Sequence, residues 1–216
     1  MQWRKKYIII CLTIFALYPP EAERQQEVIK LNKQTKTMVG IGLFTAIVMV
    51  LQFIGSGIRF GTFSISLVLV PIVVGSAVYG WKAGAWLGFV FGLTVLLSGD
   101  ASPFLAVNIP GTIAVVLVKG IVCGLVAGLI YKLLEKANRY LAVFVAAILC
   151  PVVNTGIFLL GCQLFFLETV TQWAGGSQNL ATYIFVTLTG VNFLLEVGVN
   201  VVLSPVIVRL IRIGKQ

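Results

Sequence analysis

Long stretches with little or no charge dominate this sequence and constrain what the chain can fold into. Six of them have the length, about 17 residues or more, that a helix needs to cross the hydrocarbon core of a bilayer. Because lipid offers the backbone no hydrogen bonds, we expect helices even where Val, Ile and Phe are frequent. The predicted spans are Thr37–Ile58, Phe60–Trp81, Ala83–Gly99, Gly111–Leu134, Tyr140–Leu167 and Ala181–Val208.

The composition agrees with a membrane protein. The chain is 59% hydrophobic and 11% charged, whereas a soluble domain carries roughly 25% charge, so too little polar surface exists to cover a soluble globule. We therefore predict an all-α integral membrane bundle of six helices over residues 37–216. With no histidine and four cysteines that lack metal-binding spacing, we expect no metal and no cofactor.

The basic residues predict the orientation. If the first span starts in the cytoplasm, fourteen of the sixteen lysines and arginines lie on the cytoplasmic side, as the positive-inside rule requires. We therefore predict that both termini face inward (N-in/C-in), and that the net charge of +9 meets lipid headgroups rather than nucleic acid. The three outer connections are then residues 55–64, 97–111 and 167–179.

Residues 1–36 precede the first predicted span. They combine a basic start with a short apolar run, Tyr7–Tyr18, which resembles the core of a signal peptide but is followed by no small-residue cleavage site. We expect a poorly ordered extension, or a start codon placed too far upstream, rather than a seventh helix.

Small residues recur every fourth position on three of the spans, a pattern that lets membrane helices approach closely. For the third and fourth spans we expect packing inside the bundle. For the first span, contact with a separate subunit is as plausible as internal packing. The residues are Gly42 and Ala46, then Gly84, Gly88 and Gly92, then Gly120, Gly124 and Gly128.

Ionisable and amide side chains within the spans are costly and usually face the protein interior. Lys119 and Glu196 are the charged ones, and Asn154, Asn192 and Asn200 add amides. The spacing of four places Asn192, Glu196 and Asn200 on one helix face. One interpretation is a pocket open to the outside, in which Lys119 meets a substrate carboxylate. The other is a Lys119–Glu196 pair with structural asparagines, which we favour for Asn200.

The outer connections supply further candidates. The apolar sequence "PFLAVN" within residues 97–111 predicts a segment folded back over a cavity, with Asp100 and Asn108 at its rim, although Asp100 can equally serve turn chemistry. Glycines around Arg59 and Phe60 are typical of a lid. We interpret Trp173 as a membrane-interface anchor.

Common catalytic and nucleotide-binding motifs, including the Walker A and HExxH patterns, are absent from the sequence. No convincing internal repeat of a secondary transporter is visible either. We therefore expect a binding protein that depends on others for energy, not an enzyme. A stand-alone small-molecule permease and a non-transport membrane scaffold are the alternatives.

Three stretches carry a resemblance to a known family. They are "GLFTAIVMVLQF", "FSISLVLVPIVVGSAVYGWKAGAWLGFVFGL" and "LSGDASPF…NIPGTIAVVLVKGIVCGLVAGLIYKLL". Together they resemble the substrate-binding S component of energy-coupling factor (ECF) transporters, in the pantothenate/folate-like branch. The resemblance covers about Lys36–Ile213.

The resemblance implies a subunit of the bacterial cell membrane that captures a water-soluble vitamin at the outer face. A transmembrane coupling subunit and two ATPase subunits would complete the importer. The docking contact of the family corresponds to Gly42 and Ala46, and its binding site to the later helices and the outer loops. A carboxylated vitamin suits Lys119 and Arg59, and pantothenate is the one we expect.

Overall fold

The computed structural model describes residues 21–57, 59–60, 63–64, 67–174 and 190–214. The chain divides into two compact units, residues 1–40 and 41–216. In the first unit, the described residues 21–40 are helical, so the helix that contains the first predicted span begins well before Thr37. The expectation for residues 1–20 lies outside the described residues.

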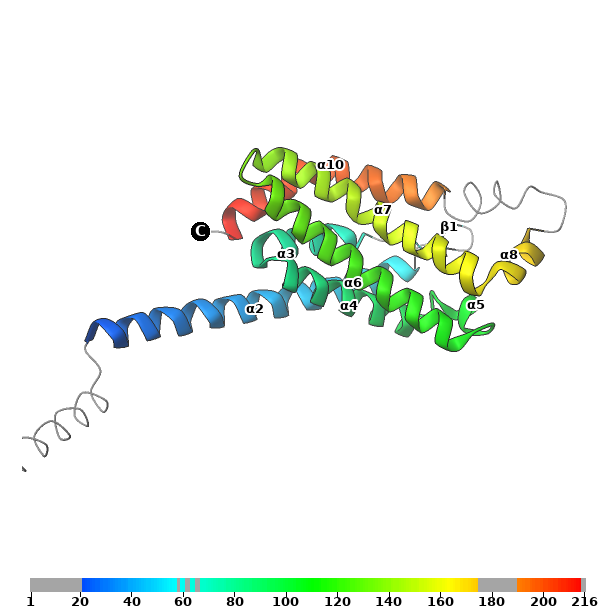
Figure 1. Ribbon diagram of the computed structural model, residues 1–216, viewed down its shortest axis with the longest axis horizontal. Coiled ribbons are helices and arrows are strands. Elements are labelled where there is room, and N and C mark those ends of the chain that lie inside the picture. Colours follow the sequence, from blue (N-terminus) through cyan, green and yellow to red (C-terminus); the bar gives the residue numbers. More distant parts are fainter. Residues whose placement is uncertain (1–20, 58, 61–62, 65–66, 175–189, 215–216) are drawn as a thin grey trace, which may run out of the picture. The chain divides into compact units, whose positions relative to one another are not determined.

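The described elements are helices and one small hairpin (Figure 1). Four helices contain segments long and apolar enough to cross a membrane, Gln34–Gly57, Ile109–Leu134, Arg139–Phe165 and Phe193–Ile211, while α3 and α4 are apolar but shorter. A helical protein with several spans is therefore confirmed, and the count of six and the orientation stay predictions. The elements are α2 (Glu21–Gly57), β1 (Arg59–Phe60), β2 (Phe63–Ser64), α3 (Leu69–Tyr79), α4 (Trp81–Leu97), α5 (Ser102–Leu105), α6 (Ile109–Leu134), α7 (Arg139–Phe165), α8 (Leu167–Trp173) and α10 (Gly190–Gly214).

The second predicted span differs most from the structure. Instead of one helix over Phe60–Trp81, its beginning forms a strand that pairs with β2, and α3 has only 11 residues. At 1.5 Å per residue this helix is about 16 Å long, roughly half of the hydrocarbon core. Phe and Thr around the hairpin favour strands, and Pro71 is accommodated in the first helical turn, where an amide hydrogen is not needed.

The connection between α3 and α4 is a tight turn, as the sequence predicted. Gly80 joins the two helices with φ of 92°, a conformation that glycine adopts without steric penalty. Its amide donates to the carbonyl of Ser76 at 2.9 Å and closes the end of α3.

The glycines of α4 and α6 pack directly against one another. A Cβ added at Gly88 would overlap the backbone carbonyl of Gly120, and one added at Gly124 would overlap that of Gly84. Toward the C-terminal end of α4, a Cβ at Gly92 would lie 2.9 Å from the carbonyl oxygen of Val116. The predicted internal packing of these two helices is therefore confirmed.

The second unit has two distinct ends (Figure 1). The connection between α6 and α7 lies at the same end as the C-terminal part of α10, whereas α5 and α8 lie at the other. Basic residues gather at the first end, where Lys132, Lys136, Arg139, Arg209 and Arg212 lie on the last turn of α6, the connection, the start of α7 and the C-terminal part of α10. Under the predicted orientation this end is cytoplasmic.

Substituting Gly88 with Ala should destabilise the bundle, because the new methyl group meets backbone that cannot rotate away. Overpacking of this kind costs about 1–3 kcal/mol, and we expect a fall of roughly 5 °C in the unfolding temperature. Thermal unfolding in detergent, followed by tryptophan fluorescence, measures it. Gly42→Ala is the matched control, since a Cβ there has nothing within 4 Å. Equal stability of the two variants would contradict the packing argument.

Candidate functional site

Lys119 lies at the meeting point of three helices. Its side chain is half-buried on α6, and its ammonium faces two rings, 5.8 Å from the centroid of Phe91 on α4 and 5.4 Å from that of Phe158 on α7. An ammonium over an aromatic face is attracted by the ring's quadrupole. Lys119 precedes Gly120 and Phe91 precedes Gly92, so the glycine contact of α4 with α6 brings this pair together.

Two carboxylates lie within electrostatic range of the Lys119 ammonium. They belong to Glu196 on α10 and to Asp100 in the connection after α4. The Glu196 side chain is only 4% exposed, and a buried carboxylate is tolerated chiefly where an opposite charge or hydrogen bonds compensate it. The structure thus brings together the two charged groups that the sequence singled out within the spans.

Buried amides lie on α7, the helix that carries Phe158, and on α10, the helix that carries Glu196; they belong to Asn154 and Asn200. Asn200 donates from its side-chain Nδ2 to the backbone carbonyl of Glu196 at 2.8 Å. The backbone carbonyl of Asn200 accepts from the Ser204 hydroxyl at 2.9 Å. Both bonds stay within α10, which suits the structural role that we favoured for Asn200.

Asn154 shares one feature with Asn200. The Oδ1 atoms of both are buried and have no hydrogen-bond partner among the described residues, a state that costs about 1–3 kcal/mol for each polar atom. Asn154 precedes Phe158 by four residues, so both face the same side of α7. It lies 11 residues before the end of α7 and Lys119 10 residues after the start of α6, which puts both about 15 Å from the same end of the bundle.

The connection between α4 and α6 folds back onto the helices. Its short helix α5 inserts Phe104, which is 4% exposed, among three rings, with centroid distances of 5.5 Å to Phe158, 5.0 Å to Phe166 and 5.4 Å to Trp173. Trp173, expected at the membrane interface, therefore packs against this aromatic cluster. Phe158 contacts Phe104 and also Lys119, so the cluster covers the charged group from the α5 end.

Asp100 has a partner that the sequence reasoning missed. The Gln52 side chain on α2 donates from Nε2 to Asp100 Oδ2 at 2.7 Å, and Gln52 is 2% exposed. The sequence did contain a signal for this bond. Gln52 is a polar amide within an uncharged span, and such a side chain is expected to be buried and hydrogen-bonded. The bond ties the first span of the chain to the connection after α4.

Asn108 has a structural task. It is the N-cap of α6, where its Oδ1 accepts from the amide of Gly111 at 3.0 Å, a bond that satisfies one of the free donors at a helix start. The cap does not test its expected place at the rim of a site, which stays a prediction.

Three other predicted site residues can be placed only by their backbones. Arg59 and Phe60 form β1, where they pair with Ser64 and Phe63 respectively, and Asn192 lies on α10. Their side chains lie outside the described part of the structure. Both residues lie in the connection between α2 and α3, which is an outer one only under the predicted orientation.

Gly42 and Ala46 lie on an open face of α2. Both are exposed, and a Cβ added at Gly42 would meet nothing within 4 Å. Larger apolar neighbours, Leu43 and Phe53, are 61% and 52% exposed. Of the two alternatives for this pair, packing within the described part of the chain is therefore disfavoured, and a surface for lipid or another subunit remains.

Comparison with known proteins identifies the family. The family described as "ECF transporter, substrate-specific component" matches residues 36–208. The chain belongs to this family. This chain is also 28% identical over 185 residues to the pantothenic acid transporter PanT of Lactococcus lactis subsp. cremoris (strain MG1363). The match covers 78% of this chain and 89% of that protein.

The family match establishes the general function. The substrate-specific component is a multi-pass protein of the bacterial cell membrane, and it is the vitamin-binding subunit of an ECF transporter. Its family is a class of transport components rather than of enzymes. The side chains around Lys119 are the described residues best suited to hold a polar ligand, since they combine charges, a buried amide oxygen and aromatic surface.

Replacing Asn108 separates its capping from a role in binding. Asn108→Ala should lower the stability of the substrate-specific component by about 1 kcal/mol, while Asn108→Ser, which keeps a capping oxygen, should be nearly neutral. Thermal unfolding compares the two variants. Loss of ligand binding in a stable Asn108→Ser protein would show that the amide contacts the ligand after all.

Proposed function

We propose that this chain captures pantothenate at the outer side of the membrane and delivers it to a transmembrane coupling subunit driven by two ATPase subunits. The observation that carries the proposal is the Lys119 ammonium, held half-buried between two aromatic rings with Glu196 in electrostatic range. The similarity to a pantothenic acid transporter supports the choice of vitamin.

The chemistry of pantothenate matches the side chains around Lys119. Its carboxylate pairs with the ammonium, an interaction that becomes strong where water is excluded. Its hydroxyl and amide N–H groups are donors, and the buried Oδ1 of Asn154 is an acceptor without a described partner. Its two geminal methyl groups suit the aromatic cluster of Phe104 and Phe158.

In this proposal the outer connections close over the ligand. Phe104 covers the site from the end of the bundle where α5 lies. The hairpin with Arg59 and Phe60 forms the second part of the cover. Asp100 and Asn192 contribute polar groups at the edge of the site. Glu196 keeps the Lys119 ammonium oriented both before and after the ligand binds. Binding then favours the closed arrangement, because a ligand stabilises the conformation to which it binds best.

Panthenol, in which an alcohol replaces the carboxylate, tests the pairing with Lys119. For the purified protein we expect pantothenate to bind at least tenfold more tightly than panthenol, since hydrogen bonds to charged groups contribute about 1.5–3 kcal/mol. Lys119→Met should weaken pantothenate binding to the level of panthenol and leave panthenol nearly unchanged. Isothermal titration calorimetry measures all four affinities.

Lys136→Met is the matched control, since it removes an exposed lysine from the connection after α6 and should alter neither affinity. Equal losses for both ligands in Lys119→Met would mean that Lys119 supports the fold rather than the carboxylate. Absence of pantothenate binding by a folded wild-type protein, with binding of another vitamin, would replace the substrate but keep the family function.

The open face of α2 is tested by Ala46→Trp. If Gly42 and Ala46 dock the coupling subunit, an indole between the helices should abolish ATP-driven uptake in proteoliposomes while pantothenate affinity stays within twofold. Leu164→Trp provides the control, because Leu164 is 75% exposed on α7 and lies outside the proposed contact. Normal uptake by Ala46→Trp would exclude this face as the docking surface.

A further inference from the structure

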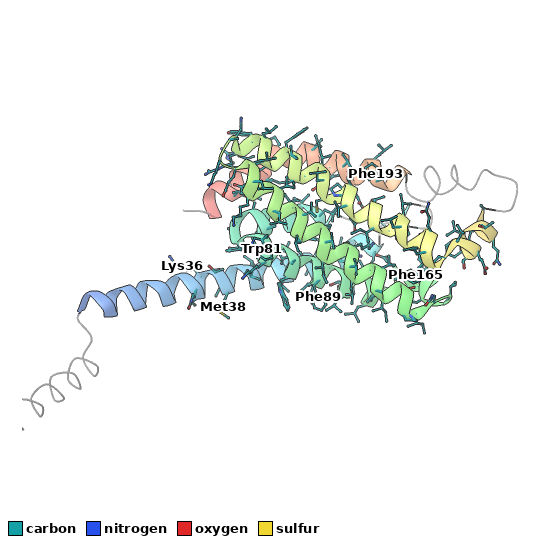
Figure 2. The ribbon with its side chains drawn as sticks, in the orientation of Figure 1. Lys36, Met38, Trp81, Phe89, Phe165 and Phe193 are labelled. Carbon is teal, nitrogen blue, oxygen red and sulfur yellow. The ribbon has the colours of Figure 1, made fainter. Side chains whose placement is uncertain are left out.

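A cavity lies far from the aromatic cluster, at the end of the bundle where α3 and α4 meet. It has a volume of about 390 Å³ and is open to the surface. The turn between α3 and α4 forms one wall, with Trp81 and Lys82, and the end of α6 forms the other, with Tyr131, Lys132 and Glu135. Figure 2 labels Trp81 here and Phe165 toward the opposite end, beside α8.

The cavity carries two cations on facing walls. Lys82 and Lys132 are both exposed, and the Lys82 ammonium is held over the Trp81 ring at 5.6 Å from its centroid. Glu135 is the one acidic residue in the lining, and it already takes part in another interaction within the protein. The hydroxyl of Ser76 donates to Val73 at 2.9 Å, which leaves its oxygen able to accept. With two lysines and one carboxylate, the lining carries a net positive charge that attracts an anion.

An apolar surface adjoins this cationic cavity. Gly128, Tyr131, Lys132 and Glu135 recur at the spacing of one helix face. Leu129 and Leu133 follow on the neighbouring face of α6, 38% and 72% exposed. A molecule bound in the cavity therefore has its polar part next to the lysines and its remaining part next to exposed leucine side chains. This arrangement suits a lipid better than a soluble anion.

The surroundings select a negatively charged lipid. Lys136, Arg139 and Arg209 lie at the same end of the bundle, and basic clusters at this level attract anionic headgroups. A volume of about 390 Å³ is within the range of sites for small organic groups.

We propose that this cavity is a binding site for an anionic phospholipid. The phosphate lies between Lys82 and Lys132, the Trp81 ring marks the headgroup level, and the acyl chains run along Leu129 and Leu133. The proposal involves none of the residues assigned to vitamin binding, so either can fail without the other.

Native mass spectrometry of the detergent-solubilised protein tests the site, with phosphatidylglycerol and phosphatidylcholine of identical acyl chains as probes. We expect phosphatidylglycerol to bind at least tenfold more tightly. The double variant Lys82→Gln/Lys132→Gln should lose about 25-fold in that affinity, since each basic residue near anionic lipid contributes a factor of about five. Its elution as a single folded species, with an unchanged unfolding temperature in lipid-free detergent, verifies the fold.

The control variant Lys136→Gln/Arg139→Gln removes the same charge outside the cavity lining. It should lose less than threefold, because these side chains do not contact the bound phosphate and their longer-range attraction is screened by salt. An equal loss in both double variants would overturn the proposal in favour of diffuse surface attraction. Equal affinity for the two lipids would overturn it as well. Soluble glycerol 3-phosphate should not compete at concentrations equal to the lipid, and effective competition would assign the cavity to a soluble anion instead.

Discussion

Close contact between the backbones of α4 and α6 is the interaction on which the rest of the structure depends. Lipid gives helices no hydrophobic reason to associate, so dispersion between tightly apposed backbones has to hold them. Gly88 and Gly120 permit that contact because a Cβ on either would overlap the other helix. The same contact carries Phe91 to within 5.8 Å of the Lys119 ammonium. The stripe of glycines therefore sets both the fold and the geometry of the charged centre.

The charged centre is tolerated because several weak compensations act together. Lys119 has two ring faces and two carboxylates within electrostatic range, and a lone ammonium in hydrocarbon would be far less stable. Asn154 retains an acceptor without a described partner. Such a group is a liability in a purely structural core, and it is useful in a protein whose function is to bind a polar molecule.

Much of this arrangement could be predicted from the sequence, and the exceptions have physical reasons. Length and hydropathy predicted the long spans, and the spacing of glycines predicted the pairing of α4 with α6. The shortness of α3 could not be anticipated, because the hairpin residues before it are also apolar. Composition alone therefore does not show where the strands end and the helix begins. Gln52 escaped notice because it carries no charge, and the first span was recognised by its lack of charged residues. The cap that Asn108 forms was not anticipated, although Asn two residues before Pro at a helix start is typical of one. Which rings Phe104 meets depends on tertiary packing alone.

The hydrogen bond from Gln52 to Asp100 has a mechanical consequence. It is a short tether, 2.7 Å long, between a helix that exposes large apolar side chains and a connection that reaches the aromatic cluster. A turn of that helix about its own axis would pull on the connection, and a shift of the connection would apply torque to the helix. As long as this bond is kept, the helix and the connection can move only together.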